Sequence, residues 1–190
     1  DTYSGNGEVV HLALQMGEKY GIGTMVTDGR IGQDITVEEA RKYISDYYDY
    51  ESFCGMRITD EPSDNNFVLG SESNDIQSWA NMGNVFSELG LNVYLNAHPT
   101  YKTDEETLEK YRSYIKEMIE SCRPNILMWD NYPFTKDGMR LHAYFANMDI
   151  CRQYSQEYGI PFWTFIQAGG QFNDARQYFD SDPYFPNEAQ

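Results

Sequence analysis

Two adjacent carboxylates follow a short apolar segment in the first half of the chain. Asp60 and Glu61 end the segment that begins at Met56, and Pro62 stops strand pairing immediately after them. At least one of the two acidic side chains must therefore face the open end of a strand.

Cleavage of a glycosidic bond requires a carboxylic acid that protonates the departing oxygen, and partial burial can raise the pKa of a glutamate for that role. We interpret Glu61 as this catalytic acid and Asp60 as a supporting residue that binds substrate. The alternative is structural: Asp60 would cap the next helix or bond to a loop, and Glu61 would pair with a surface arginine.

A second acid, Asp130, follows the apolar segment Ile126–Trp129 and lies between Trp129 and Tyr132. An aromatic ring beside a carboxylate suits a sugar ring, which can stack on it. Strand ends two apart around a barrel can lie about 5 to 10 Å apart, which accommodates a nucleophile or a base acting through water. We predict that Asp130 is the second catalytic carboxylate and that Tyr132 binds substrate. The alternative is an aspartate that holds its own loop by local hydrogen bonds.

Several other residues with polar or aromatic side chains lie at or near the ends of the remaining apolar segments and are candidates for substrate binding. They are Asp28, Asn96, His98, Trp163 and Gln167. Asp28 could instead organise its loop through Arg30. The sequence contains no HExxH, HxH or CxxC motif, and its three cysteines are far apart, so we predict neither a metal site nor a disulfide framework. The predicted chemistry requires no cofactor.

Five short apolar segments recur at spacings of one strand plus one crossover helix. They are Gly23–Thr27, Gly55–Thr59, Asn92–Leu95, Ile126–Trp129 and Phe162–Ile166. The intervals have helical periodicity with boundary signals, such as the capping box that begins at Thr36 and the glycines at positions 90 and 159. Alternating strands and helices predict an α/β fold with a parallel sheet covered by helices.

Two architectures fit this alternation: an open doubly wound sheet and a TIM-type (β/α) barrel. Polar residues end each of the five segments, and no GxGxxG motif follows the first, which favours a barrel mouth over a nucleotide site. At 190 residues the chain is shorter than the roughly 250 residues of a complete barrel. We therefore expect one incomplete domain, residues 1–190, that covers strands 3 to 7 and needs the remaining barrel segments or a partner copy.

The charge balance narrows the choice of partners. The chain carries 30 acidic and 14 basic residues, a net charge of −16, and no stripe of lysine or arginine. Nucleic acid and anionic membrane surfaces are therefore poor partners, and no segment is apolar enough to predict membrane insertion.

The segments Gly55–Pro62, Tyr94–Pro99, Trp129–Phe134 and Pro161–Gln167 together resemble uncharacterised bacterial glycoside hydrolases related to the clan A (β/α)8 barrels. The most specific elements are the DEP motif on strand 4 and the DxYPF motif on strand 6. The acid/base glutamate of clan A follows an asparagine at the end of strand 4, so the resemblance implies that role for Glu61, with Asp60 in place of the asparagine. It also implies an exported protein, extracellular or periplasmic.

The chain departs from this family at the nucleophile, which in clan A is a glutamate at the end of strand 7. Gln167 lies near that position and cannot be a carboxylate nucleophile. Asp130 or a carboxylate outside this sequence would have to replace it, or the site would only bind. We expect hydrolysis of O-glycosidic bonds in a carbohydrate substrate. The alternatives are a non-catalytic sugar-binding barrel and, third, a metal-assisted hydrolase that uses Asp28, Asp60 and His98.

Overall fold

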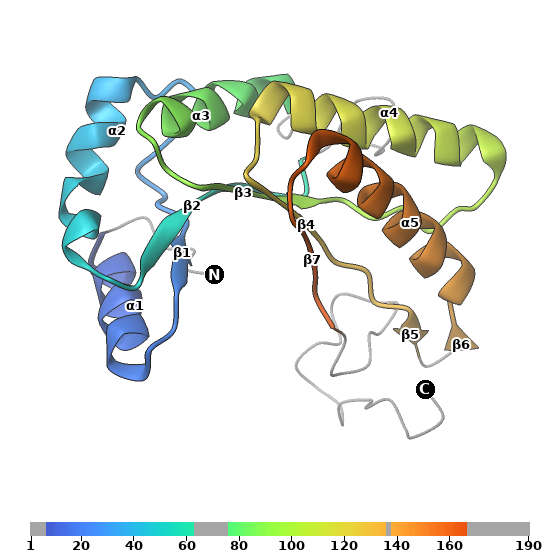
Figure 1. Ribbon diagram of the computed structural model, residues 1–190, viewed down its shortest axis with the longest axis horizontal. Helices are drawn as coiled ribbons and strands as arrows, with labels where there is room; N and C mark the ends of the chain where they lie inside the picture. The colour runs from blue at the N-terminus through green and yellow to red at the C-terminus, as the bar shows by residue number, and fades with distance from the viewer. Residues whose placement is uncertain (1–6, 63–75, 136–137, 167–190) are drawn as a thin grey trace.

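The computed structural model describes residues 7–62, 76–135 and 138–166, and it shows an α/β fold (Figure 1). Five strands form one parallel sheet, in the order β1 (Thr24–Val26), β2 (Phe53–Asp60), β3 (Val93–Ala97), β4 (Ile126–Trp129) and β7 (Phe162–Thr164). Each of the five predicted apolar segments contains or overlaps one of these strands. The predicted α/β class and the parallel sheet are therefore confirmed.

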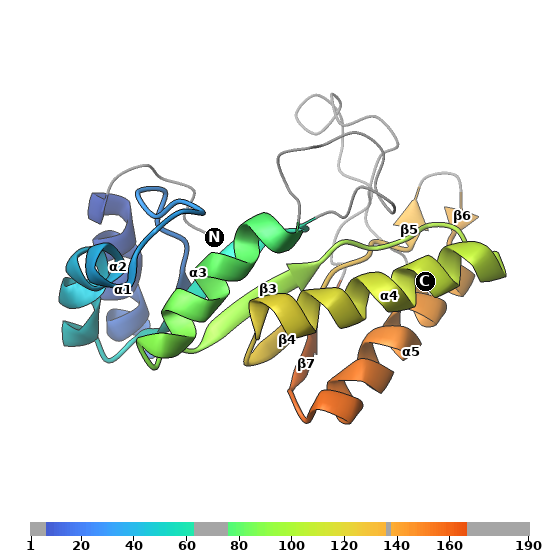
Figure 2. The same ribbon diagram turned by 90° about the horizontal axis from the view of Figure 1, so that it is seen from above.

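The strand order in the sheet is the same as the order along the chain. Right-handed crossovers between sequential neighbours place every connecting helix on the same face of the sheet. Figures 1 and 2 show α3 (Ile76–Glu88), α4 (Glu105–Cys122) and α5 (Leu141–Tyr158) along one face. The opposite face carries the side chains that point away from the helices.

Local signals in the sequence set the helix ends. α2 (Val37–Ile44) begins at the predicted capping box, in which Thr36 and Glu39 bond to each other's backbone N–H groups. The N-cap of α4 is Asp104, and α5 ends at Gly159, whose φ of 67° suits glycine. α1 (Gly7–Tyr20) and α3 also lie where the apolar periodicity predicts helices.

Three short elements were not predicted. The 3-10 helix η1 (Ser45–Asp49) follows α2 directly, and β5 (Phe134–Thr135) pairs antiparallel with β6 (Gly138–Met139). Two-residue strands are too short to give a periodic signal.

The core lies between the helices and the sheet. Its largest fully buried side chains are aromatic, and they come from helices as well as strands: Trp129, Tyr47, Tyr111, Tyr114 and Phe86. Among the described residues, no helix has the length and apolar character needed to span a membrane.

Candidate active site

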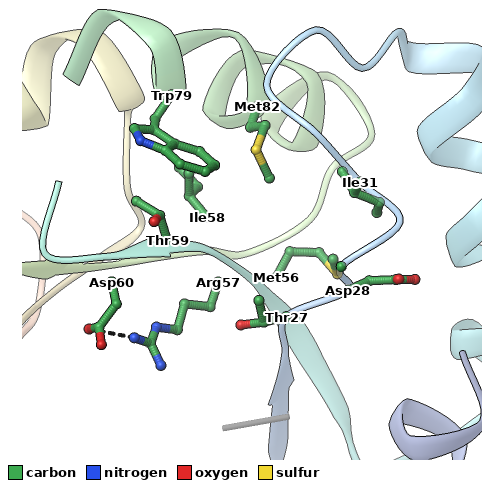
Figure 3. A pocket seen from close by; sticks show the side chains of 11 residues that line it. Thr27, Asp28, Ile31, Met56, Arg57, Ile58, Thr59, Asp60, Trp79 and Met82 are labelled. Atoms are coloured by element: carbon green, nitrogen blue, oxygen red, sulfur yellow. Dashed lines mark ion pairs between the residues drawn. The ribbon is translucent and has the colours of Figure 1, made fainter. Parts of the chain in front are cut away.

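The end of β2 is irregular, and this irregularity determines which side chains reach the face opposite the helices. The pairing register with β3 shifts between Arg57 and Asp60. Residues three apart on a regular strand point to opposite faces, but Arg57 and Asp60 lie on the same side and form an ion pair of 2.5 Å. Figure 3 shows this pair on one side of β2 and Trp79 on the other.

Asn96, at the end of β3, joins the acids of the two neighbouring strands. Its Nδ2 donates to Asp60 Oδ1 at 2.9 Å and to Asp130 Oδ1 at 2.7 Å. The side chain is 4% exposed, and its Oδ1 accepts no hydrogen bond from the described part of the chain. The reverse amide orientation would direct Oδ1 at both carboxylates, so these contacts fix the orientation.

Glu61 lies directly after β2 in a backbone conformation that is rare for its residue type. Its φ is 45°, in the left-handed region, and its N–H donates to the Asn96 carbonyl at 3.1 Å. Such strained residues cluster at functional sites. The side chain makes a hydrogen bond with Asp130.

The Glu61 carboxyl has a strongly perturbed acidity. Burial raises its pKa to about 7, helped by the negative charges of Asp130 and Asp60 and by the hydrogen bond with Asp130, while Arg57 opposes the shift. Glu61 therefore remains largely protonated below neutral pH, although an ordinary glutamate would be ionised there.

A hydrogen bond joins the carboxyl of Glu61 to Asp130, so the structure brings the two predicted acids together. Tyr132 also bonds to Asp130, and burial together with this carboxylate raises the pKa of the Tyr132 hydroxyl. Glu61 therefore lies beside a second acid whose negative charge favours the protonated form of Glu61.

His98 flanks this pair, and a buried tyrosine holds the loops in place. His98 Nε2 lies 3.9 Å from Glu61 Oε2, and its Nδ1 contacts the Pro99 carbonyl at 2.7 Å. Because a carbonyl can only accept, Nδ1 carries a proton there. Tyr114 of α4 accepts from the His98 N–H at 2.9 Å and donates to the Pro62 carbonyl at 2.6 Å. One helix residue thus fixes the loops that follow β2 and β3.

Asp28 does not join these groups by any hydrogen bond that the structure describes. Its buried carboxylate accepts from Arg30 Nε at 2.9 Å and from the Tyr47 hydroxyl at 2.6 Å. Burial alone would raise the Asp28 pKa, but the bonds from Arg30 and Tyr47 outweigh it, and the pKa is lowered. These contacts match the alternative in which Asp28 organises its loop through Arg30.

A cavity of about 350 Å³ lies beside β2, where the strand faces α3. Figure 3 shows Ile58, Trp79 and Met82 on the helix side of the strand. Asp28, Arg57 and Asp60 also line this cavity, although the side chains of Arg57 and Asp60 point to the other side of the strand, whereas Glu61 and Asp130 do not line it.

Trp163 lies at the margin of the same open face. It pairs in register with Met128, whose other neighbour in the sheet is Asn96. Its side chain is 49% exposed, and its ring lies 6.0 Å from the ring of Tyr94. Gln167 lies outside the described residues.

No group of three or more histidine, cysteine or acidic side chains in the described part of the chain could hold a metal ion. Arg57 was not among the predicted site residues, because simple alternation along β2 would place it on the face opposite Asp60. An arginine within an otherwise apolar strand was the available signal. Comparisons of the chain with protein-family models, with curated proteins and with solved structures found no match.

Proposed function

We propose that the protein hydrolyses O-glycosidic bonds in oligo- or polysaccharides, with Glu61 as the proton donor. The observation that supports this proposal is the contact between the Glu61 and Asp130 carboxyls at the C-terminal end of the sheet. A general acid must hold a proton at the working pH and have a pKa near it, and the Glu61 pKa of about 7 meets both requirements.

The proposal includes a barrel, of which the five strands would be strands 3 to 7. The sequential strand order and the helices on a single face support it, because a sheet wound in one direction can curl toward its uncovered face. Barrel enzymes carry their active sites at the C-terminal ends of the strands, where Glu61 and Asp130 lie. The remaining strands would come from further segments of the protein or from a partner copy.

The role of Asp130 follows from its contact with Glu61. Catalytic carboxyls are about 5 to 5.5 Å apart in retaining glycosidases and about 6.5 to 9.5 Å apart in inverting ones, farther than a direct hydrogen bond. In the resting site, the protonated Glu61 carboxyl donates a hydrogen bond to Asp130. A bound sugar must part the two carboxyls before Asp130 acts as a base or a nucleophile.

The test compares the Glu61→Gln variant with the wild type on two classes of glycoside. Methyl glycosides have a poor leaving group and need a proton donor, whereas 4-nitrophenyl glycosides need one much less. We expect a loss of roughly 10²- to 10⁴-fold on methyl glycosides and a smaller loss on nitrophenyl glycosides. Glu157→Gln, an exposed change on α5, is the matched control.

The pH dependence provides a second readout of the same role. Glu61 acts in its protonated form, so kcat/KM should fall about tenfold per pH unit above the Glu61 pKa of about 7. Equal activity of Glu61→Gln and the wild type on methyl glycosides would refute the assignment.

A sugar-binding protein without turnover is the second candidate. The observation in its favour is again the direct hydrogen bond between Glu61 and Asp130, because catalytic carboxyls of glycosidases are farther apart than such a bond. In that case Glu61→Gln would retain sugar affinity in calorimetric titrations, and the wild type would cleave neither class of glycoside.

A further inference from the structure

We infer that Asn96 is a positioning residue that keeps the proton of the site on Glu61 by binding the neighbouring carboxylates of Asp60 and Asp130. The inference rests on the proposed role of Glu61 as proton donor and adds a cause for its protonation. It starts from an asymmetry in the hydrogen bonds around the pair.

The donors converge on Asp130. Its carboxylate receives Asn96 Nδ2 at 2.7 Å, and it also bonds to the Tyr132 hydroxyl. Glu61 has no comparable neutral donor among the described side chains, since His98 Nε2 lies 3.9 Å away. Hydrogen bonds that donors make to the charged form favour ionisation, so the acid with more donors gives up the proton.

The other neighbour of Asn96 strengthens the asymmetry. The same Nδ2 donates to Asp60, which is also paired with Arg57 at 2.5 Å, so Asp60 is held as an anion beside Glu61. A fixed negative charge there favours the neutral form of Glu61. One amide group therefore stabilises two anions and leaves the third acid as the site for the proton.

The described groups that face Glu61 come from four parts of the fold. They are Asp60 and Arg57 of β2, His98 after β3, Asp130 and Tyr132 after β4, and Tyr114 of α4. Arg57 is the described cation that opposes protonation of Glu61, and its direct partner is Asp60. The negative charges of the acidic neighbours and the hydrogen-bond donors on Asp130 outweigh the effect of Arg57 on the protonation of Glu61.

The test follows the Glu61 carboxyl directly by NMR, in protein labelled with ¹³C at the glutamate side-chain carboxyls. The signal that disappears in Glu61→Gln identifies Glu61. In the wild type, most of its chemical-shift change should occur in a step near pH 7. Asn96→Leu removes the amide from a buried position and should make proton loss from Glu61 roughly tenfold to a hundredfold more favourable, which lowers the pH of its step by about one to two units.

In Asn96→Leu, the Glu61 step should therefore lie below pH 7, because the hydrogen bonds that favour the charged neighbours of Glu61 are lost. If leucine prevents folding, Asn96→Ala tests the same prediction with a smaller side chain. Tyr94→Phe is the matched control: it also removes a polar group from the open face of β3, but its hydroxyl donates to the Cys54 carbonyl, away from the acids.

A folded Asn96 variant whose Glu61 titrates as in the wild type would overturn the inference. So would a wild type in which the Glu61 signal shows no step near pH 7. Neither result depends on turnover. Glycosidase activity that needs Glu61 but shows no Asn96 effect on this titration would leave the proposed function standing. An Asn96 effect on this titration without glycosidase activity would reject the proposed function and leave this inference standing.

Discussion

Two buried asparagines of this chain have opposite hydrogen-bonding states. Asn147 of α5 bonds to the Thr100 N–H at 2.7 Å, to the Thr100 carbonyl at 3.0 Å and to the Ala143 carbonyl at 2.7 Å. Asn131, directly after Asp130, is equally buried, but neither polar atom of its amide has a partner in the described part of the chain. A buried amide without partners destabilises the folded state.

We expect leucine to have opposite effects at these two positions. Asn131→Leu should raise the free energy of unfolding by about 1 kcal/mol, because it removes an unsatisfied amide. Asn147→Leu should lower it by about 2 to 4 kcal/mol, because it leaves the backbone groups of Thr100 without their partner. Urea titrations followed by circular dichroism measure both. Destabilisation of the same size in the two variants would show that volume, and not hydrogen bonding, decides the effect.

The two acids of the candidate site could be predicted from the sequence more readily than the side chains that set their charge state. Glu61 and Asp130 could be found because each follows an apolar segment, and parallel strands bring their C-terminal ends to one edge. The contribution of Arg57 depends on a register shift in β2, which alternation cannot reveal. Asp28 carries the same local signal as Asp130, but its hydrogen bond with Tyr47 depends on the fold.

At the scale of elements, α3 and α4 approach each other closely at a glycine. A Cβ added at Gly83 would lie 2.1 Å from the Cys122 carbonyl oxygen, so the two helices could not keep their distance. A Cβ added at Gly32, in the loop before α2, would meet nothing within 4 Å. These two glycines differ in the space around them, and neither requires a left-handed backbone.

Gly83→Ala should therefore lower the free energy of unfolding by about 1 to 3 kcal/mol, the usual range for an overpacked contact. Gly32→Ala should change it by less than about 0.5 kcal/mol or raise it slightly, since alanine restricts the unfolded chain. Thermal unfolding of both variants beside the wild type measures the difference. If Gly83→Ala left the midpoint unchanged, the close helix contact would be wrong.

Most element boundaries followed from local chemistry. Thr36 and Gly159 could be recognised as helix ends because their side-chain and backbone requirements are local. The β5–β6 pair could not, since two residues per strand give no period and their pairing depends on a turn. The α3–α4 contact at Gly83 depends on tertiary packing, which periodicity does not encode.

At the scale of the whole molecule, the sheet has a protected centre and two less protected sides. β3 is buried along its whole length and pairs with strands on both sides, whereas β1 and β7 each pair on one side within the described residues. Two residues of β7, Trp163 and Thr164, are exposed. Alternation of strands and helices predicted the parallel sheet, but closure into a barrel depends on contacts beyond these strands.

Amide hydrogen exchange should report this gradient. We expect the amides of β3 to exchange at least about tenfold more slowly than those of β7, because local opening is easiest where few contacts hold the backbone. β2 and β4 serve as internal references, since each also has two neighbours. Protection of β7 equal to that of β3 would instead show that its outer edge is covered, as in a closed barrel.

The charged and polar groups around Glu61 lie on or directly after consecutive strands. Arg57 is the first of them along the chain, and Tyr132 is the last. Among the described residues, all the groups that we infer to place the proton lie within that stretch of the chain. A gene segment that encodes β2 to β4 and the loop after β4 as far as Tyr132 therefore carries the whole arrangement. Recombination could exchange the flanking units, and with them the surroundings of the site, while the proton-holding pair passed intact from one protein to another.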